Sequence, residues 1–162
     1  MTCFSMKSSS MPAALGNQTI LDLPLIAFLC SCKAPPEAVL RCYDWAIAQR
    51  EAGNCVISGF HSPLEKDVLR YLLKGQQPVV LALARGMKQQ WEPTLQKALD
   101  NGRLLIISPF TEKTRRALAD TAAVRNDMMI NLAERVVVGY AEPEGMLARR
   151  LRMEREKEVI SL

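Results

Sequence analysis

The stretch Cys55-Val-Ile-Ser-Gly-Phe-His-Ser-Pro-Leu-Glu65 decides the fold. Residues 55–58 have the short apolar pattern of a buried strand, and Gly59 then opens a turn. Ser62 is a suitable helix N-cap, Pro63 a favoured first helical residue and Glu65 the reciprocal partner of a capping box. Strand, turn and helix follow one another without slack, as they do in α/β proteins.

The same alternation extends along the chain on both sides of this unit. We expect further strands at 25–29, 79–84, 104–107 and 136–140, and helices at 36–53, 62–75, 94–99 and 124–134, with a solvated terminal helix from residue 145 onward. Parallel strands need crossover connections, and these are right-handed. The sequence therefore predicts a Rossmann-like, doubly wound α/β fold: a mainly parallel sheet of five or more strands with helices on both faces.

The length and composition are those of one globular domain. The chain has 162 residues, of which 49% are hydrophobic and 23% charged, so it is neither disordered nor fibrous. We expect a flexible leader at 1–15 and a single domain at 16–162. The longest apolar stretch, 20–30, is interrupted by Asp22 and Pro24 and is too short to cross a bilayer. We therefore expect a cytoplasmic protein without a membrane partner.

Several kinds of chemistry lack their usual motifs in this chain. There is no G-x-S-x-G, no G-x-G-x-x-G and no G-x-x-x-x-G-K-[ST], which removes the usual support for serine hydrolysis, dinucleotide chemistry and P-loop hydrolysis. The five cysteines form no C-x-x-C pair, and His61 is the single histidine. We expect no catalytic residue, no metal site and no cofactor.

Ligands of open parallel sheets bind at the carboxyl ends of the strands, so the turns there are the candidate sites. Ser31 and Lys33 follow the first strand and provide a hydroxyl and a cation. Arg85 follows the third predicted strand and is a further candidate for contact with a ligand, although a basic residue in a loop is usually only solvated. The net charge of +4 is compatible with an anionic partner, although it is low for a protein that coats nucleic acid.

The turn after the second predicted strand gives the strongest local signal. Free N–H groups and the positive end of the helix dipole would attract a phosphate there. Gly59 would allow close approach, and Ser58, His61 and Ser62 offer hydrogen bonds. The alternative is that Ser62 and Glu65 only cap the helix.

The pair Arg125-Asn126 is predicted just before or at the start of a helix. A guanidinium there can clamp a phosphate through two parallel hydrogen bonds. The alternative is a surface ion pair of Arg125 with Asp127 or Glu134. Together these turns predict one pocket at the carboxyl edge, lined by Ser31, Lys33, Ser58, Gly59, His61, Ser62, Arg125 and Asn126, with Arg85 as a further candidate.

Taken in order, these motifs resemble the Rossmann-like domain of the DNA-processing protein A (Smf) family, over residues 16–147. That family has a G-S-R type turn, an S-G-x-A-x-G-I-D motif, and an R-N pair before a V-V-V strand. The corresponding residues are Cys30-Ser31-Cys32 with Lys33 nearby, Ser58-Gly59 with Leu64-Glu65, and Arg125-Asn126 before Val136-Val137-Val138; Ser108-Pro109-Phe110 also resembles a family turn. Cys32 stands in place of the arginine, and Pro63 in place of the second glycine.

The resemblance implies binding of single-stranded DNA along a basic pocket, transfer of that DNA to a recombinase during DNA uptake, and self-association into a homo-oligomer. It implies no covalent catalysis. If Lys33, Arg85 and Arg125 each neutralise one phosphate, log affinity should fall with log salt with a slope of about −2. Two alternatives stay open. One is a nucleotide-processing enzyme resembling the lysine-decarboxylase-like phosphoribohydrolases, whose P-G-G-x-G-T-x-x-E motif is absent, and the other is a sensor of a small nucleotide.

Overall fold

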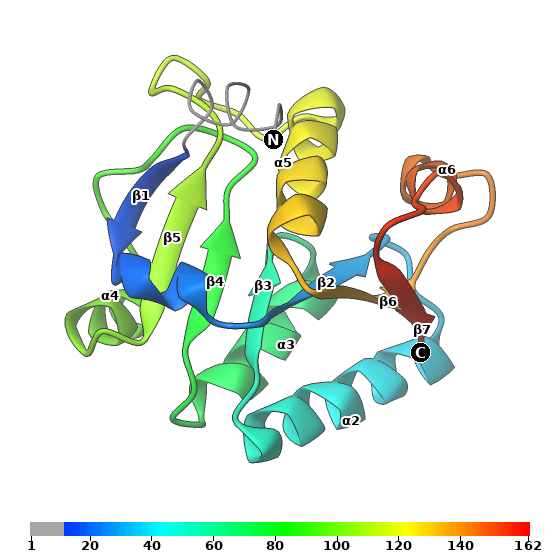
Figure 1. The fold of residues 1–162 in the computed structure, drawn as a ribbon, viewed down its shortest axis with the longest axis horizontal. Helices are drawn as coiled ribbons and strands as arrows, with labels where there is room; N and C mark the ends of the chain where they lie inside the picture. Colours follow the sequence, from blue (N-terminus) through cyan, green and yellow to red (C-terminus); the bar gives the residue numbers. More distant parts are fainter. Residues whose placement is uncertain (1–11) are drawn as a thin grey trace.

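Seven strands form one sheet in residues 12–162, the part of the chain that the computed structural model describes (Figure 1). The strands are β1 (Ala13–Gly16), β2 (Leu25–Cys30), β3 (Cys55–Ser58), β4 (Val79–Ala82), β5 (Leu104–Ser108), β6 (Arg135–Tyr140) and β7 (Glu158–Ser161). Their order across the sheet is β1-β5-β4-β3-β2-β6-β7. Among the strands of the described residues, only β1 is antiparallel to its neighbour, so the predicted Rossmann-like, mainly parallel fold is confirmed.

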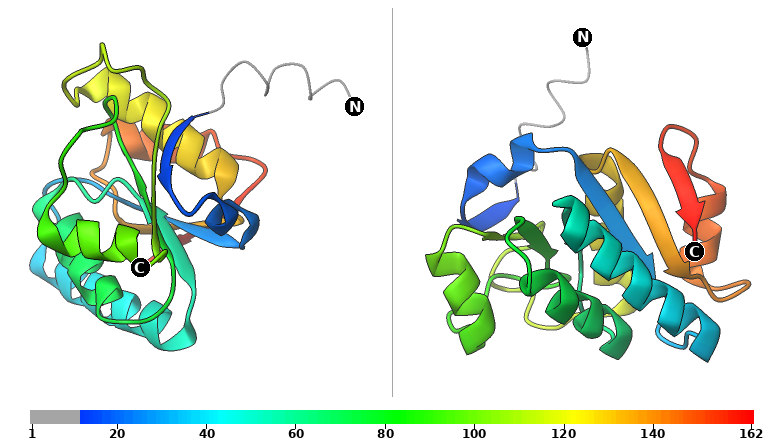
Figure 2. Two further views of the ribbon diagram at one scale, coloured as in Figure 1. Left: turned by 90° about the vertical axis from the view of Figure 1, so that its left-hand side faces the viewer. Right: turned by 90° about the horizontal axis from the view of Figure 1, so that it is seen from below.

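Helices cover both faces of this sheet (Figure 2). One face carries α2 (Pro36–Ala52), α3 (Pro63–Leu73) and α4 (Pro93–Asp100); the other carries the 3-10 helix η1 (Gln18–Asp22), α5 (Ala119–Leu132) and α6 (Met146–Arg152). Strand β2 serves both layers, because successive side chains point to opposite faces. Ile26 and Phe28 pack with the first layer, while Ala27 and Leu29 pack with the second.

The helices begin and end where local chemistry predicts. Pro36, Pro63 and Pro93 stand at the first helical positions of α2, α3 and α4, where a missing N–H costs no hydrogen bond. Gly53 ends α2 with a φ of 74°, a left-handed conformation that glycine adopts without a steric penalty. None of the helices in the described part of the chain has the length and apolar character to cross a bilayer.

Both edge strands differ from the sequence-based expectations. Residues 13–15 of the predicted flexible leader belong to β1, which pairs with β5, while residues 1–11 lie outside the described part. The predicted terminal helix is shorter than expected, because α6 ends at Arg152 and the chain then forms β7 beside β6. Val159 and Ile160 of β7 are each 37% exposed. An edge strand of this kind is held by backbone pairing, so the pattern of its side chains does not predict it.

Helix α5 also begins earlier than predicted, at Ala119 rather than near Val124. The backbone N–H of Leu118 donates to Thr121 Oγ1 at 2.8 Å, which closes the first turn, and Asp120 places a negative charge at the positive end of the helix. Arg125 and Asn126 therefore lie inside the helix. Their predicted place at its start is wrong.

Candidate anion-binding pocket

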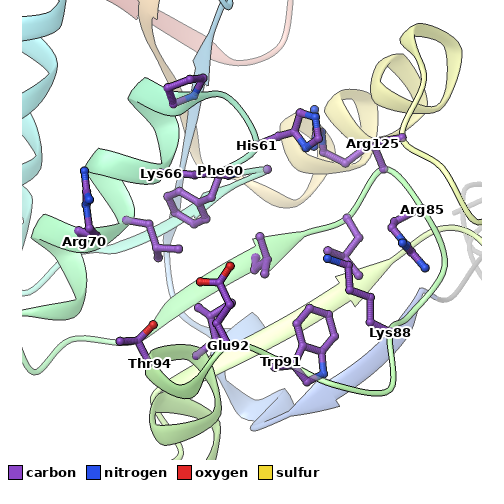
Figure 3. Close-up of a pocket in the computed structure, with 18 of the residues that line it drawn as sticks. Phe60, His61, Lys66, Arg70, Arg85, Lys88, Trp91, Glu92, Thr94 and Arg125 are labelled. Atoms are coloured by element: carbon purple, nitrogen blue, oxygen red, sulfur yellow. The ribbon is translucent and has the colours of Figure 1, made fainter.

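A pocket of about 900 Å³ opens beside the carboxyl ends of β3 and β4, between α3 and α4 (Figure 3). Its lining comes from the turn after β3, from α3, from residues 81–95, from the loop at 115–118 and from α5. The cationic lining residues are Lys66, Arg70, Arg85, Lys88, Arg115, Arg116 and Arg125, against the acidic Asp67 and Glu92. Arg70 pairs with Asp67, so Glu92 is the one remaining carboxylate of the lining that the described residues form. The other cations therefore make the pocket strongly positive.

The turn after β3 is held by hydrogen bonds to one buried carboxylate. The Ser62 N–H donates to Glu65 Oε1 at 3.0 Å, and the Glu65 N–H donates to Ser62 Oγ at 3.3 Å, which confirms the predicted capping box. The Ser58 hydroxyl donates to Glu65 Oε2 at 3.3 Å. Both serine hydroxyls are therefore engaged within the turn, and neither residue lines the pocket.

The backbone of the turn after β3 is strained at Phe60, next to the pocket. Phe60 has a φ of 44°, which is uncommon for any residue other than glycine and costly for a large one. Its ring is buried, whereas the next residue, His61, is exposed, and both line the pocket (Figure 3).

Arg125 reaches the pocket from inside α5 and is buried, with 8% of its surface accessible. Its Nε donates to Asn126 Oδ1 at 2.8 Å and its Nη1 to the Ala82 carbonyl at 3.5 Å. The guanidinium packs against Gly59 so closely that a Cβ there would overlap it. The alternative ion pair with Asp127 does not form, since that carboxylate pairs with Arg150.

The charge of Arg125 is only partly compensated. Burial lowers the pKa of its guanidinium, and the nearby carboxylate of Glu65 opposes this shift. No salt bridge to Arg125 and no hydrogen bond from its Nη2 occurs within residues 12–162. A buried cation with donors left over, at the wall of a basic pocket, favours an anionic ligand.

Two further arginines come from a loop that the sequence did not single out. The Gly86 N–H donates to the Thr114 carbonyl at 2.7 Å, and a Cβ on Gly86 would overlap the Thr111 carbonyl. These contacts fasten the loop after β5 to the turn after β4, which carries Arg85. Arg115 and Arg116 follow directly and line the pocket. Tertiary contacts thus bring together cations from turns that lie far apart in the sequence.

The carboxyl end of β2 has a different environment. Ser31 Oγ accepts the Glu142 N–H at 2.9 Å, and the Ser31 N–H donates to the Tyr140 carbonyl at 2.7 Å, so this residue joins the turns after β2 and β6. Lys33 is exposed, and neither residue lines the pocket. A hydrogen bond with Cys42, together with burial, raises the pKa of the neighbouring Cys30 thiol, which keeps it protonated and a poor nucleophile.

The structure thus separates the predicted site residues by position. Those that line the pocket are Gly59, His61, Arg85 and Arg125; those that support it from behind are Ser58, Ser62 and Asn126; those that lie elsewhere are Ser31 and Lys33. Contact of any of them with a ligand stays a prediction.

No protein-family model matches the sequence, and no curated protein sequence matches it. Solved structures with a similar fold include DNA processing protein A of Helicobacter pylori, described for its single-stranded DNA binding mode, with a TM-score of 0.73 and 17% identity over 91% of this chain and 69% of that one. DNA processing protein A of Streptococcus pneumoniae has a TM-score of 0.72 and 16% sequence identity, again over 91% of this chain. A molybdenum cofactor binding protein from Rippkaea orientalis has a TM-score of 0.59 and 13% sequence identity, over 86% of this chain and 76% of that one.

These likenesses establish a fold like that of the Rossmann-like domain in DNA processing protein A, as the sequence motifs predicted. At such low identity they carry no residue roles. The chain spans about half the length of the Streptococcus pneumoniae protein, 53%, so the similarity concerns one part of that protein.

Proposed function

We propose that this chain binds single-stranded DNA in the pocket between α3 and α4, with phosphates against Arg85, Arg115, Arg116 and Arg125. The observation that carries the proposal is the buried guanidinium of Arg125, which lines the pocket with an unused Nη2 and no salt bridge in the described structure. A phosphate accepts two parallel hydrogen bonds from such a group and offsets the cost of burying its charge.

The lining of the pocket favours a single strand over a duplex. Beside the cations it contains the aromatic side chains of Phe60 and Trp91 and the apolar side chains of Leu81 and Leu83. A duplex presents phosphates but keeps its bases stacked inside, whereas a single strand offers both phosphates and unstacked bases. The fold shared with the Helicobacter pylori protein supports this ligand class. Self-association and delivery of the DNA to a recombinase complete the proposal, on the family resemblance alone.

A free nucleotide is the second candidate. A volume of about 900 Å³ lies within the range of pockets that enclose small molecules. The fold is also similar to that of a molybdenum cofactor binding protein, which takes a small ligand.

The test is fluorescence anisotropy with a labelled oligothymidylate, repeated at increasing salt. Four phosphate contacts, each worth about −0.7, predict a slope of log affinity against log salt of about −3. A labelled duplex is the control and should bind more weakly. Absence of binding at low salt would overturn the proposal, and displacement by thymidine monophosphate at similar concentration would favour the second candidate.

A further inference from the structure

The pocket also contains the indole ring of a tryptophan, Trp91. Trp91 belongs to the segment between β4 and α4, and its half-buried ring lines the pocket together with Lys88 (Figure 3). The Lys88 Nζ lies 5.8 Å from the centroid of this ring. Lys88 is exposed, so its ammonium can leave the ring at little cost.

The indole N–H of Trp91 makes no hydrogen bond within the described part of the chain, although its Nε1 is buried. A buried tryptophan N–H usually has an acceptor, and the ring here is held by packing against the core instead. Trp45, the other tryptophan of the chain, differs, because it stacks on Phe28 with 5.0 Å between ring centroids.

We infer that Trp91 is the platform on which a base of the bound strand stacks. This inference rests on the proposed function and adds a base-dependent contact to the phosphate contacts. The base takes the place of the Lys88 ammonium over the ring, and the ammonium moves out into solvent. Stacking on an aromatic ring needs no particular base, since every base has a π-face, so the contact selects unstacked strands rather than a sequence.

The experiment separates bases from phosphates. In a Trp45→Phe variant, Trp91 is the remaining tryptophan of the sequence and reports on the pocket. Oligothymidylate should quench its fluorescence and bind about tenfold more tightly than an abasic oligonucleotide of the same length, which should leave the fluorescence nearly unchanged.

A second pair of variants gives the same answer without fluorescence. Trp91→Leu should lower the affinity for oligothymidylate about tenfold, while the affinity for the abasic strand and the salt slope stay the same. Trp91→Phe keeps an aromatic face and should restore most of the loss. Circular dichroism shows whether each variant is folded.

The outcomes also separate the inference from the proposed function. Equal affinity and equal quenching for the two oligonucleotides, with a slope of about −3, would overturn stacking on Trp91 and leave DNA binding intact. Failure of wild-type protein to bind either oligonucleotide would overturn both.

Discussion

Two arginines lie at opposite edges of the sheet, one where the parallel strands begin and the other where they end. They differ in how many of their N–H groups donate hydrogen bonds to the protein. Arg103 precedes β5 at the amino edge; its Nε and Nη2 donate to the Gln77 carbonyl at 3.2 and 3.0 Å, and its Nη1 to the Leu73 carbonyl at 3.0 Å. Arg125 lies at the carboxyl edge, with one backbone carbonyl at 3.5 Å and one amide oxygen as acceptors.

Burial lowers the pKa of both guanidinium groups, although Arg103 is half-buried and Arg125 is buried. The difference that bears on a ligand is in the hydrogen-bond acceptors. Arg103 holds the end of α3 to the start of β4, whereas Arg125 keeps Nη2 without an acceptor among the described residues. An arginine whose three nitrogens all donate to carbonyls of the protein stabilises the fold, and one with a nitrogen left over is suited to a ligand.

The largest expected effect comes from replacing each of these arginines by methionine, which keeps much of the volume. Arg103→Met should lower the free energy of unfolding by about 2 kcal/mol, because several carbonyls lose their donor, and should leave DNA affinity unchanged. Arg125→Met should lower DNA affinity tenfold or more while costing less than about 1 kcal/mol of stability. Urea unfolding and fluorescence anisotropy on both variants provide the two measurements. If both variants lose only stability, the distinction between the two arginines fails.

A second prediction sharpens the contrast between the pocket and the carboxyl end of β2. Replacing Arg115 and Arg116 together by glutamine should make the salt slope shallower by about 1.4, since each lost phosphate contact contributes about 0.7. Lys33→Gln is the matched control, an exposed cation outside the pocket, and should leave the slope unchanged. All three residues are exposed, so stability should not change. A shallower slope for Lys33→Gln would instead extend the DNA path to β2.

The smallest expected effect is that of Gly59→Ala. The added Cβ overlaps the tip of the Arg125 side chain, which is flexible enough to move aside. DNA affinity should fall about threefold, which corresponds to about 0.7 kcal/mol. In the Arg125→Met background the same change should have no further effect, because the group it displaces is gone. Additive losses in this double-mutant cycle would mean that Gly59 acts by another route.

The inner part of the fold could be predicted because its signal is local. Strand β2 is apolar throughout and buried, and Ser62, Pro63 and Glu65 specify the start of α3 by themselves. The edge strand β7 was missed because Val159 and Ile160 stand half exposed after a charged segment, where backbone pairing with β6 decides the structure.

The candidate site was less predictable, because tertiary contacts assemble it. The turns after β3 and β4 follow from the topology of a parallel sheet, and they provided Gly59, His61 and Arg85. Arg115 and Arg116 join them because the Gly86 N–H bonds to the Thr114 carbonyl and the Ser108 hydroxyl to the Arg85 carbonyl, contacts that no short-range pattern reveals. Ser31 was expected in the pocket, and its hydroxyl instead serves the turn after β6.

The strand order bears on how the chain folds as it is synthesised. Ile26 of β2 pairs with Val56 on one side and with Arg135 on the other. One neighbour of β2 therefore leaves the ribosome early and the other only after most of the chain. Contacts between such distant residues slow folding, and an apolar strand with an open edge can pair with other chains in the meantime. The nascent protein therefore carries an apolar strand with one open edge until β6 has emerged, and we expect its yield to depend on keeping unfinished chains apart.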